Sequence, residues 1–410
     1  MTDRVLDGVT SDPVAMGWMQ GMPPPLERRI VAAHADHMRF PTNRYAYSNM
    51  REFLPTLNVA RGQGAARALP VALRDDIDAI VFTPLGDGAP VRWDDGLIGN
   101  YTDGIVVLHR GAVVYDRWFG VTGPQSRHIV FSVTKSFVGT VAEMLIEQGL
   151  LDPSAPVVDF VPELARSGFG DATVRQVMDM TTALDFSEDY TDPTSGIGAF
   201  SAALGLTPRP PGYAGPQDLY AYLPTVAKAG THGERFTYRT CNTEVLGWIV
   251  ARIEGQRLHR VLSDRLWGPL GLADDADMLV DSAGTPFAGG GLNPTLHDLA
   301  RFGEALRLDG AGVIPPAAVA RIRAGGDRAH FAQADYPQLP GWSYRSQWWI
   351  SHDAHETFSA RGIHGQTLHV DPAAEMVVAR FASHPIAANG ANDVLSLPAW
   401  AALAEHLQRG

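Results

Sequence analysis

The chain has 410 residues, 33 of them basic and 45 acidic, so its formal net charge is −12. An acidic surface without lysine runs repels phosphate backbones, which argues against nucleic-acid binding. No stretch approaches the ~18 consecutive apolar residues that a membrane span needs. The first residues lack the basic start and apolar core of a secretory signal, so we expect a soluble, cytoplasmic protein.

The first 80 residues predict an irregular segment packed against a folded domain, because prolines 23–25 and the polar stretch PTNRYAYSN show no periodicity. Regular structure starts near Gly104, where GIVVLHRGAVVYDRWFG is typical of a β-hairpin turning at Arg110 and Gly111. Helical spacing of apolar residues follows over 132–151 and continues to about residue 280. It is interrupted by a proline-rich loop at 207–217, which could cover a cleft.

Strand patterns return after about residue 340 in SYRSQWWI, QTLHV and EMVVARFA, and a closing helix is predicted over 392–406 with Asn392 as its N-cap. These late strands need partners, so we expect one sheet assembled from both ends of the chain. The predicted fold class is α/β, with an antiparallel sheet flanked by helices plus an inserted, mostly helical domain. The expected limits are 1–80 for the N-terminal segment, 81–131 and 281–410 for the α/β domain, and 132–280 for the helical domain.

The strongest chemical signal is the S-x-x-K motif formed by Ser132 and Lys135 at a helix start. Only Lys135 and Lys228 among the basic residues are lysines, and a lysine, unlike an arginine, can lose its proton when it is desolvated. Positions i and i+3 share a helix face, so the amine can reach the serine hydroxyl and activate it as a nucleophile. An exposed Ser and Lys is the alternative, but apolar neighbours on both sides favour a buried catalytic start.

Two further segments are candidates. In GERFTYRTCNTEV, Tyr238 could shuttle a proton and Asn242 is predicted to cap a helix starting at Thr243 or Glu244; packing and plain capping are the alternatives. In SARGIHGQTLHV, glycines 362 and 365 permit close backbone approach, and a strand edge here could supply an oxyanion donor. A simple β-bulge would explain the same glycines.

Other sequence patterns are weaker evidence of a functional site. The histidine clusters at 34–37 and 352–356 lack the H-E-x-x-H arrangement, so we assign no metal. The sequence has no G-x-S-x-G elbow, no Walker loop and no G-x-G-x-x-G after a predicted strand. Its single cysteine, Cys241, excludes an internal disulfide, and we expect it to pack in the interior.

The three motifs, in this order, resemble the serine β-lactamase and penicillin-binding superfamily, in its class C-like branch with carboxylesterases and D-aminopeptidases. Within that branch the chain is similar to the 6-aminohexanoate-dimer (nylon oligomer) hydrolases, through PTNRYAYSN, FSVTKS, DFSEDYTDP, YRSQWW and GIHGQ. The resemblance implies that Ser132 is the nucleophile, Lys135 its general base and Tyr238 the proton relay. It also implies backbone oxyanion donors at Ser132 and Ile363. We expect the substrate to be bound at five positions: Tyr190, Ser201, Gly289, Trp349 and His364.

The chain departs from the superfamily pattern in two places. The spacing from Tyr238 to its asparagine is longer than Y-x-N, and I-H-G-Q stands where K-T-G is usual, which removes the basic partner of a β-lactam carboxylate. At the position of Gly289, the resemblance implies a polar side chain in the nylon oligomer hydrolases. The loop at 196–206 has no acidic residue. We therefore expect short neutral acyl esters to be better substrates than a 6-aminohexanoate dimer, whose ammonium group needs a partner.

The leading prediction is a serine hydrolase that cleaves linear amides or short-chain esters through an acyl-enzyme. A β-lactamase, a D-aminopeptidase or D,D-peptidase, and a non-catalytic ligand-binding relative stay open as alternatives. We expect a small-molecule substrate, no cofactor, and no nucleic-acid or membrane partner, and the sequence leaves a homodimer open. Lys135 should be neutral at working pH, with its pKa lowered by burial and by competition with Tyr238 for one proton network.

Overall fold

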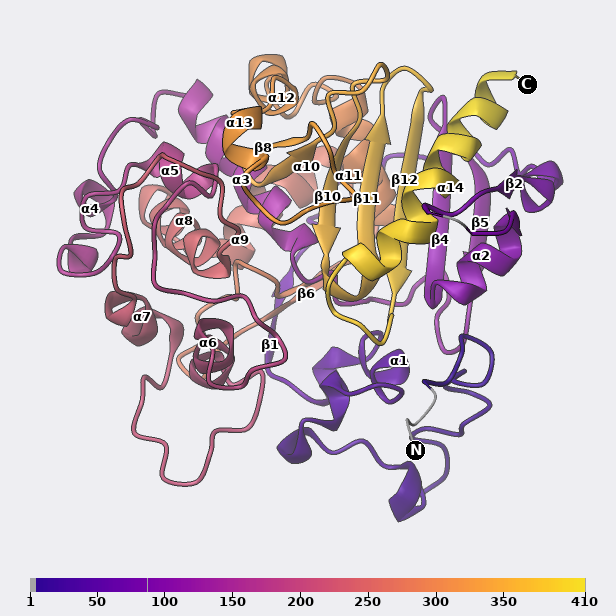
Figure 1. Ribbon diagram of the computed structural model, residues 1–410, viewed down its shortest axis with the longest axis horizontal. Helices are drawn as coiled ribbons and strands as arrows, with labels where there is room; N and C mark the ends of the chain where they lie inside the picture. The colour runs from indigo at the N-terminus through magenta and orange to yellow at the C-terminus, as the bar shows by residue number, and fades with distance from the viewer. Residues whose placement is uncertain (1–4, 87, 410) are drawn as a thin grey trace.

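The computed structural model describes residues 5–86 and 88–409, which form a large antiparallel sheet with helices on both faces and a helical region beside it (Figure 1). None of the described helices is long and apolar enough to cross a membrane. The strands are β1 (Thr56–Val59), β2 (Val81–Phe82), β3 (Val91–Arg92), β4 (Thr102–His109), β5 (Ala112–Trp118), β6 (Ala276–Leu279), β7 (Leu292–Asn293), β8 (Ser343–Arg345), β9 (Trp348–Ile350), β10 (Phe358–Gly362), β11 (Gln366–Asp371) and β12 (Met376–Ala382). The α-helices are α1 (Asn43–Ala46), α2 (Trp93–Gly99), α3 (Val133–Glu147), α4 (Val157–Phe160), α5 (Val174–Met178), α6 (Gly196–Leu204), α7 (Leu219–Tyr222), α8 (Thr240–Glu254), α9 (Leu258–Leu262), α10 (Gly268–Leu270), α11 (Leu296–Arg307), α12 (Pro316–Arg323), α13 (Arg328–Phe331) and α14 (Gly390–Arg409).

The main sheet has seven strands in the order β5-β4-β12-β11-β10-β9-β8, and every neighbouring pair is antiparallel. The early hairpin β4–β5 joins the late strands through β4 and β12, where Ile105 lies opposite Arg380. Arg110 and Gly111 both adopt positive φ, 51° and 81°, as the tight turn between two twisted strands requires. The sheet is therefore built from both ends of the chain, and this prediction is confirmed.

Both faces of this sheet are covered, which explains why every residue of β4 is buried, with the apolar run 105–108 at its centre. Ile105 and Val107 face one side, where they share a core with Trp93 of α2 and Trp400 of α14. Val106 and its i+2 neighbour on β4 face the other side, where α3 and α11 pack. Figure 1 shows α14 crossing the near face of β12 and β4.

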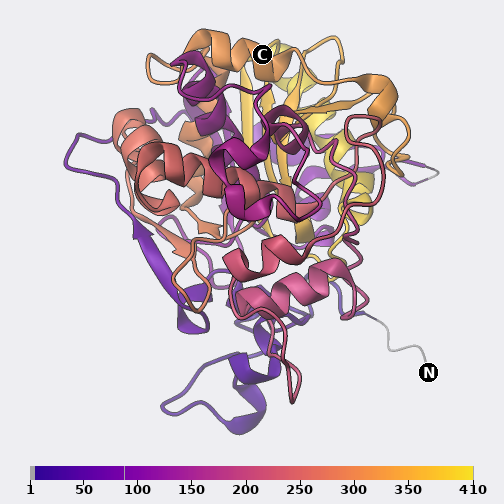
Figure 2. The same ribbon diagram turned by 90° about the vertical axis from the view of Figure 1, so that its left-hand side faces the viewer.

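The helical region lies beside the sheet, with α4 to α9 grouped on the left of Figure 1 and facing the viewer in Figure 2. Helix α3 connects the two parts, because it packs on α8 on one side and on β9, β10 and β11 on the other. All its residues from Val133 to Leu145 are buried. The predicted domain limits stay a prediction, but the residue before α3, Ser132, lies where the helical region meets the sheet.

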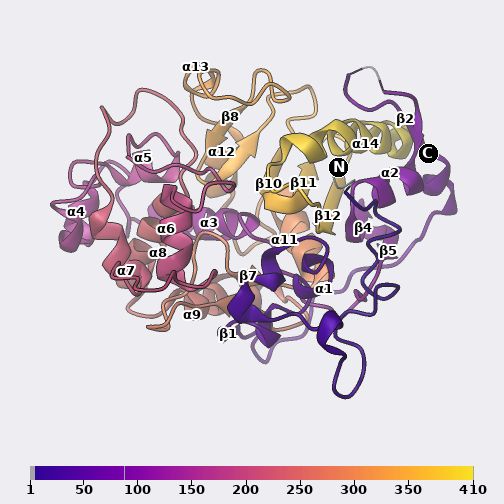
Figure 3. The same cartoon turned by 60° about the horizontal axis from the view of Figure 1, so that its bottom comes forward.

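The N-terminal segment is not wholly irregular. Its short 3-10 turns and α1 wrap the lower side of the molecule (Figure 3), as expected, but residues 56–59 form β1, which pairs with β6 so that Thr56 lies opposite Leu279. Together with β7 these strands make a three-stranded sheet. The sequence did not predict β1 because only one of its four side chains, that of Val59, is buried, so no apolar alternation marks it.

Two other predictions about elements are corrected. SYRSQWWI is not one strand but the hairpin β8–β9, since Ser346 and Gln347 turn the chain with φ of 50° and 69°. The last helix starts at Gly390, so Asn392 lies inside it and is no N-cap. The backbone carbonyl of Asn392 instead accepts a hydrogen bond from Asn100 Nδ2 at 3.2 Å.

Candidate active site

Ser132 occupies the N-terminal end of α3, at the end of a segment that is held tightly on both sides. The Ile129 N–H donates to Tyr47 O at 2.9 Å, and the Val130 N–H donates to Leu292 O at 3.0 Å. Ser132 is 8% exposed, and within the described chain its own N–H donates to no acceptor. A free N–H at a helix start is suited to stabilise an oxyanion.

Lys135 is placed to act on this serine. Its Nζ lies 2.9 Å from Ser132 Oγ and donates to Gly289 O at 2.6 Å, while the side chain is 1% exposed. Burial lowers the pKa of Lys135 to about 8, against the opposing effect of the negative charges of Glu188 and Glu244. A neutral fraction of the amine is therefore present near neutral pH, and it can accept the serine proton.

Tyr238 stands on the other side of the serine. Its ring stacks on Trp349 with centroids 5.5 Å apart, and Lys135 Nζ lies 5.3 Å from the Tyr238 ring centroid. Burial raises the pKa of Tyr238 well above its usual value, and a hydrogen bond with Ser132 acts in the opposite direction. The phenol is thus a proton donor at neutral pH. The low pKa of Lys135 comes from burial, and Tyr238 is not among the groups that shift it.

Asn242 is not the cap of the helix that follows Tyr238. Helix α8 begins at Thr240, so Asn242 lies in its first turn, fully buried, and its Oδ1 accepts a hydrogen bond from Thr182 Oγ1 at 2.7 Å. The helix starts earlier than predicted because the Thr240 N–H is taken by the carboxylate of Glu188, a partner distant in sequence.

Ile363 is brought beside the serine by a close approach of two backbones. A Cβ on Gly362 would lie 2.4 Å from Val130 O, so only glycine lets the end of β10 come this near to the segment before Ser132. Ile363 follows directly and lines the same cavity as Ser132. The glycines around Ile363 thus act as the sequence predicted, by permitting close approach.

Ser132 opens into a cavity of about 510 Å³. Of the residues predicted for the site, Ser132, Tyr190, Tyr238, Trp349 and Ile363 line it. The full lining is Ser132, Glu188, Tyr190, residues 235–239, 333–336 and 338, Trp349, Arg361, Ile363, residues 388–390 and Asp393. The proline-rich loop at 207–217 is absent from this lining; its Arg209 side chain turns back to Ala202 O at 3.0 Å.

The other three predicted substrate contacts lie elsewhere. Ser201, in α6, donates its hydroxyl to Ile197 O at 2.7 Å. Gly289 is buried behind Lys135, where a Cβ would lie 2.6 Å from Thr240 Cγ2. His364 is buried against the rings of Tyr47 and Phe131, and burial lowers its pKa to about 4. None of them lines the cavity of Ser132.

Charged residues outside the predicted substrate contacts also line the cavity. Glu188 Oε2 accepts a hydrogen bond from the Tyr190 hydroxyl at 2.7 Å. Arg361 forms a buried ion pair with Asp393, and its guanidinium lies 5.3 Å from the Trp349 ring centroid. A basic group is therefore present here despite the I-H-G-Q sequence, and strand alternation from Ile363 would have pointed to Arg361.

No cluster of three or more His, Cys, Asp and Glu side chains suited to a metal ion occurs in the described ranges 5–86 and 88–409. Cys241 is fully buried in the first turn of α8, and burial raises the pKa of its thiol well above the usual value.

These features are those of a serine hydrolase of β-lactamase fold. The family model described as Beta-lactamase matches residues 96–393, and the chain belongs to this family. It is 38% identical over 352 residues to the 6-aminohexanoate-dimer hydrolase of Paenarthrobacter ureafaciens, covering 84% of this chain and 86% of that protein.

Solved structures of the same fold superpose on the chain. A Bacillus anthracis protein provisionally named a 6-aminohexanoate-dimer hydrolase superposes with a TM-score of 0.85 at 29% identity, covering 95% of this chain and 99% of its own. The simvastatin synthase LovD of Aspergillus terreus gives a TM-score of 0.59 at 17% identity over 77% of this chain and 96% of that one, which is a likeness of fold.

Proposed function

We propose that this hydrolase cleaves linear esters or amides of small molecules through an acyl-enzyme on Ser132. The observation that carries the proposal is the pair formed by Ser132 and Lys135, with 2.9 Å between Oγ and Nζ and a buried amine whose pKa is lowered to about 8. A buried lysine beside a serine hydroxyl, with the pKa near working pH, has the properties of a general base. A ligand-binding relative would not need this pairing.

In the proposed reaction, Lys135 takes the Ser132 proton as Oγ attacks the substrate carbonyl. The negative charge that develops on the carbonyl oxygen is stabilised by the N–H groups of Ser132 and Ile363. The proton then passes through Tyr238 to the departing alcohol or amine, which leaves the acyl group on Ser132. A water molecule, deprotonated by the same groups, releases the acid and restores the serine hydroxyl.

The cavity supports a linear substrate with an aliphatic chain, since Tyr190, Tyr238, Tyr336 and Trp349 supply aromatic walls. The expected preference against a 6-aminohexanoate dimer loses its basis, because neither Gly289 nor Ser201 lines this cavity while Glu188 does. A carboxylate in the wall can pair with an ammonium group. The names of the two relatives above support including this dimer among the proposed substrates.

The direct test is covalent labelling. Purified protein is incubated with a fluorophosphonate probe, and intact mass followed by peptide mapping should place one adduct on Ser132. The Ser132→Ala variant should remain unlabelled, and Lys135→Arg should be labelled far more slowly because arginine cannot accept the proton. Turnover is then measured with p-nitrophenyl esters, the 6-aminohexanoate dimer and a chromogenic cephalosporin. An adduct on another residue of active protein, or rapid turnover of the cephalosporin alone, would contradict the proposal.

A further inference from the structure

Arg239 directly follows Tyr238 and lines the catalytic cavity, yet no carboxylate of the described residues pairs with its charge. The Nη1 atom makes one long contact, 3.4 Å to Tyr238 O, and Nε is buried without a hydrogen bond in the described part of the chain. The guanidinium takes part in no ion pair with a described carboxylate. Leaving a half-buried charge and a buried N–H unpaired is costly unless a ligand supplies the acceptor.

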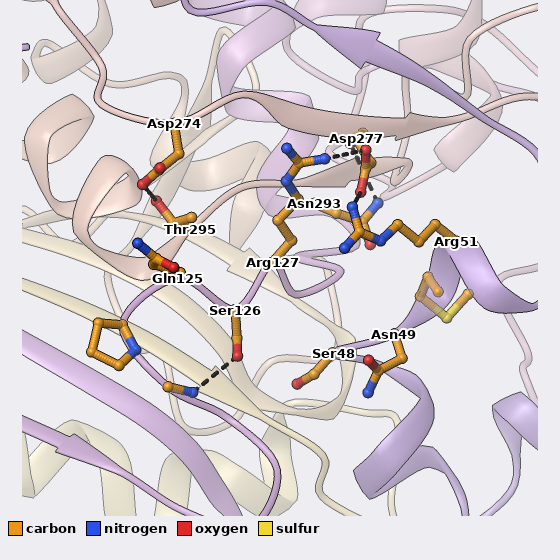
Figure 4. Close-up of a pocket in the computed structure, with 13 residues that line it drawn as sticks. Ser48, Asn49, Arg51, Gln125, Ser126, Arg127, Asp274, Asp277, Asn293 and Thr295 are labelled. Atoms are coloured by element: carbon orange, nitrogen blue, oxygen red, sulfur yellow. Dashed lines mark hydrogen bonds and ion pairs between the residues drawn. The ribbon is translucent and has the colours of Figure 1, made fainter. Parts of the chain in front are cut away.

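Two other buried arginines of this chain are paired with carboxylates, whereas the buried Arg380 makes only hydrogen bonds, to Thr102 Oγ1 and Asn100 O. Arg361, in the same cavity, is held by Asp393, and Arg44 by Asp103 at 3.3 Å. A second cavity, of about 810 Å³, shows the same pattern: in Figure 4 both Arg127 and Arg51 point to Asp277, at 2.5 and 4.0 Å. Both arginines of that cavity have a carboxylate partner, whereas Arg239 has none among the described residues.

The surroundings of Arg239 add positive charge. Arg235 lines the cavity beside it, is exposed, and is among the groups that lower the pKa of Arg239, after the larger effect of burial. Glu188 acts in the opposite direction, and its two oxygens accept hydrogen bonds from Thr240 and Tyr190 rather than from Arg239. This corner of the site therefore favours an anion.

There is also space for an anion beside Arg239. Arg235, Thr237 and Arg239 line both the catalytic cavity and a second cavity of about 270 Å³, so these three residues border both spaces. In the proposed mechanism Tyr238, which lies between Thr237 and Arg239, delivers the proton to the leaving group. A tail on the leaving group would accordingly extend past Arg239.

We propose that Arg239, assisted by Arg235, binds a carboxylate carried by the leaving group of the substrate. This inference rests on the proposed function and specifies its substrate class: esters or amides whose alcohol or amine half ends in a carboxylate. The planar guanidinium can donate two parallel N–H groups to the two carboxylate oxygens, which fixes the leaving group beside Tyr238.

The test compares two aryl acetates of matched shape, 4-acetoxybenzoate and its neutral isostere 4-acetoxybenzamide. Each kcat/KM is divided by the rate constant for alkaline hydrolysis of the same compound, which removes the intrinsic difference between the leaving groups. For the unmodified protein we expect a normalised ratio of about tenfold or more in favour of the carboxylate. The preference should shrink as salt is raised.

In Arg239→Met the normalised ratio should fall to about one. Arg239→Lys should recover only part of the preference, because an ammonium group cannot donate two parallel N–H groups to the carboxylate. Because the readout is a ratio, a general loss of activity cancels. Arg166→Met is the matched control: Arg166 is exposed and outside the cavity, and the variant makes the same change in net charge. Should Arg239→Met fail to fold, product inhibition of the unmodified protein decides, with 4-hydroxybenzoate expected to inhibit more strongly than 4-hydroxybenzamide.

Equal normalised rates for the two acetates, or equal inhibition by the two products, would overturn the subsite while leaving the proposed function intact. A preference for a carboxylate on the acyl side alone, measured with phenyl glutarate against phenyl butyrate, would also overturn it. Failure of Ser132 to react with the fluorophosphonate probe would instead remove the proposed function, and this inference with it.

Discussion

Glu244 and Lys135 are joined through the peptide groups of Gly289: Glu244 Oε1 accepts the Gly289 N–H at 2.6 Å, and Lys135 Nζ donates to the Gly289 carbonyl at 2.6 Å. The second carboxyl oxygen, Oε2, accepts the Ala288 N–H at 3.1 Å. Glu244 is buried, and burial raises its pKa to about 8. Glu244 is therefore a positioning residue, which holds the loop that in turn holds the base.

Replacing Glu244 tests this relationship. In Glu244→Gln the amide oxygen can still accept one N–H but the amide nitrogen cannot accept the other, so the 288–289 loop should shift and kcat should fall by about 10- to 100-fold. Around and above pH 8, where Glu244 is ionised, the variant also removes a negative charge that favours protonated Lys135, so activity should reach its plateau at lower pH. Glu254→Gln is the control, since Glu254 ends the same helix and pairs with Arg265. A drop in kcat with an unmoved pH profile would indicate a structural role only.

The pH dependence of the unmodified protein follows from Lys135. Burial lowers its pKa from 10.5 to about 8, and only the neutral amine can act as a base. Activity should therefore rise with pH to a plateau, with half of the plateau reached near pH 8, and decline as Lys135 becomes protonated below it. The profile is measured as kcat/KM with an activated ester, whose leaving group needs no proton. A flat profile between pH 6 and 9 would contradict the assignment of Lys135 as base.

Tyr238 should matter most when the leaving group needs a proton. Amines are poor leaving groups until they are protonated, whereas p-nitrophenolate leaves unaided. Tyr238→Phe keeps the stacking on Trp349 but removes the hydroxyl, so it should reduce amide hydrolysis by about 10- to 100-fold more than activated-ester hydrolysis. Equal losses with both substrates would show that Tyr238 acts on Ser132 or only in packing.

Sequence patterns predicted the features that depend on neighbours close in the chain. The β4–β5 hairpin follows from apolar runs around Arg110 and Gly111, and the pairing of Ser132 with Lys135 follows from helical spacing. The close approach at Gly362 was also predictable, because glycine at a strand end is typical of backbone contact.

The features that were missed depend on contacts between distant segments. Asn242 has the residue type of an N-cap, but Glu188, 52 residues earlier than Thr240, binds the first N–H of the helix instead. Gly289 lies next to Lys135 rather than in the cavity. This position results from the packing of the 287–291 loop on α8, which the sequence does not reveal. Arg239 looked like an ordinary arginine because the absence of a carboxylate partner cannot be read from the chain.

Gly289 itself gives a prediction. A Cβ there would lie 2.6 Å from Thr240 Cγ2 and 2.8 Å from Glu244 Oε1, so Gly289→Ala must displace the loop that holds Lys135. We expect a loss of about 1–3 kcal/mol in the free energy of unfolding, together with reduced kcat. Gly64→Ala is the control, because nothing lies within 4 Å of a Cβ at that position. Denaturant titration and ester turnover provide the measurements. Equal stability of the two variants would contradict the packing described around Gly289.

The last prediction concerns the attachment of the N-terminal segment. Arg44 is 3% exposed and Asp103, at the start of β4, is 2% exposed, with Nη2 and Oδ1 3.3 Å apart. Arg44 Nη1 also donates to Gly8 O at 2.6 Å, so one guanidinium ties the first residues to the main sheet. Arg44→Met removes these bonds and leaves Asp103 buried with His128 and Ser383 as its remaining hydrogen-bond partners, so the free energy of unfolding should fall by about 3–5 kcal/mol.

The control for this change is an exposed arginine of the same segment. Arg51 is 63% exposed and lies 4.0 Å from Asp277, so Arg51→Met should cost less than about 1 kcal/mol. The pKa of Asp103 lies below its ordinary value, because bonding to His128 and Arg44 outweighs burial. The stabilisation is therefore present above the pKa of the unfolded chain and is lost as pH falls through the lower folded value. Denaturant titrations of the two variants at pH 7 should differ clearly, and the double variant Arg44→Met with Asp103→Asn should recover part of the loss. If Arg44→Met and Arg51→Met cost the same, the buried ion pair does not anchor the segment.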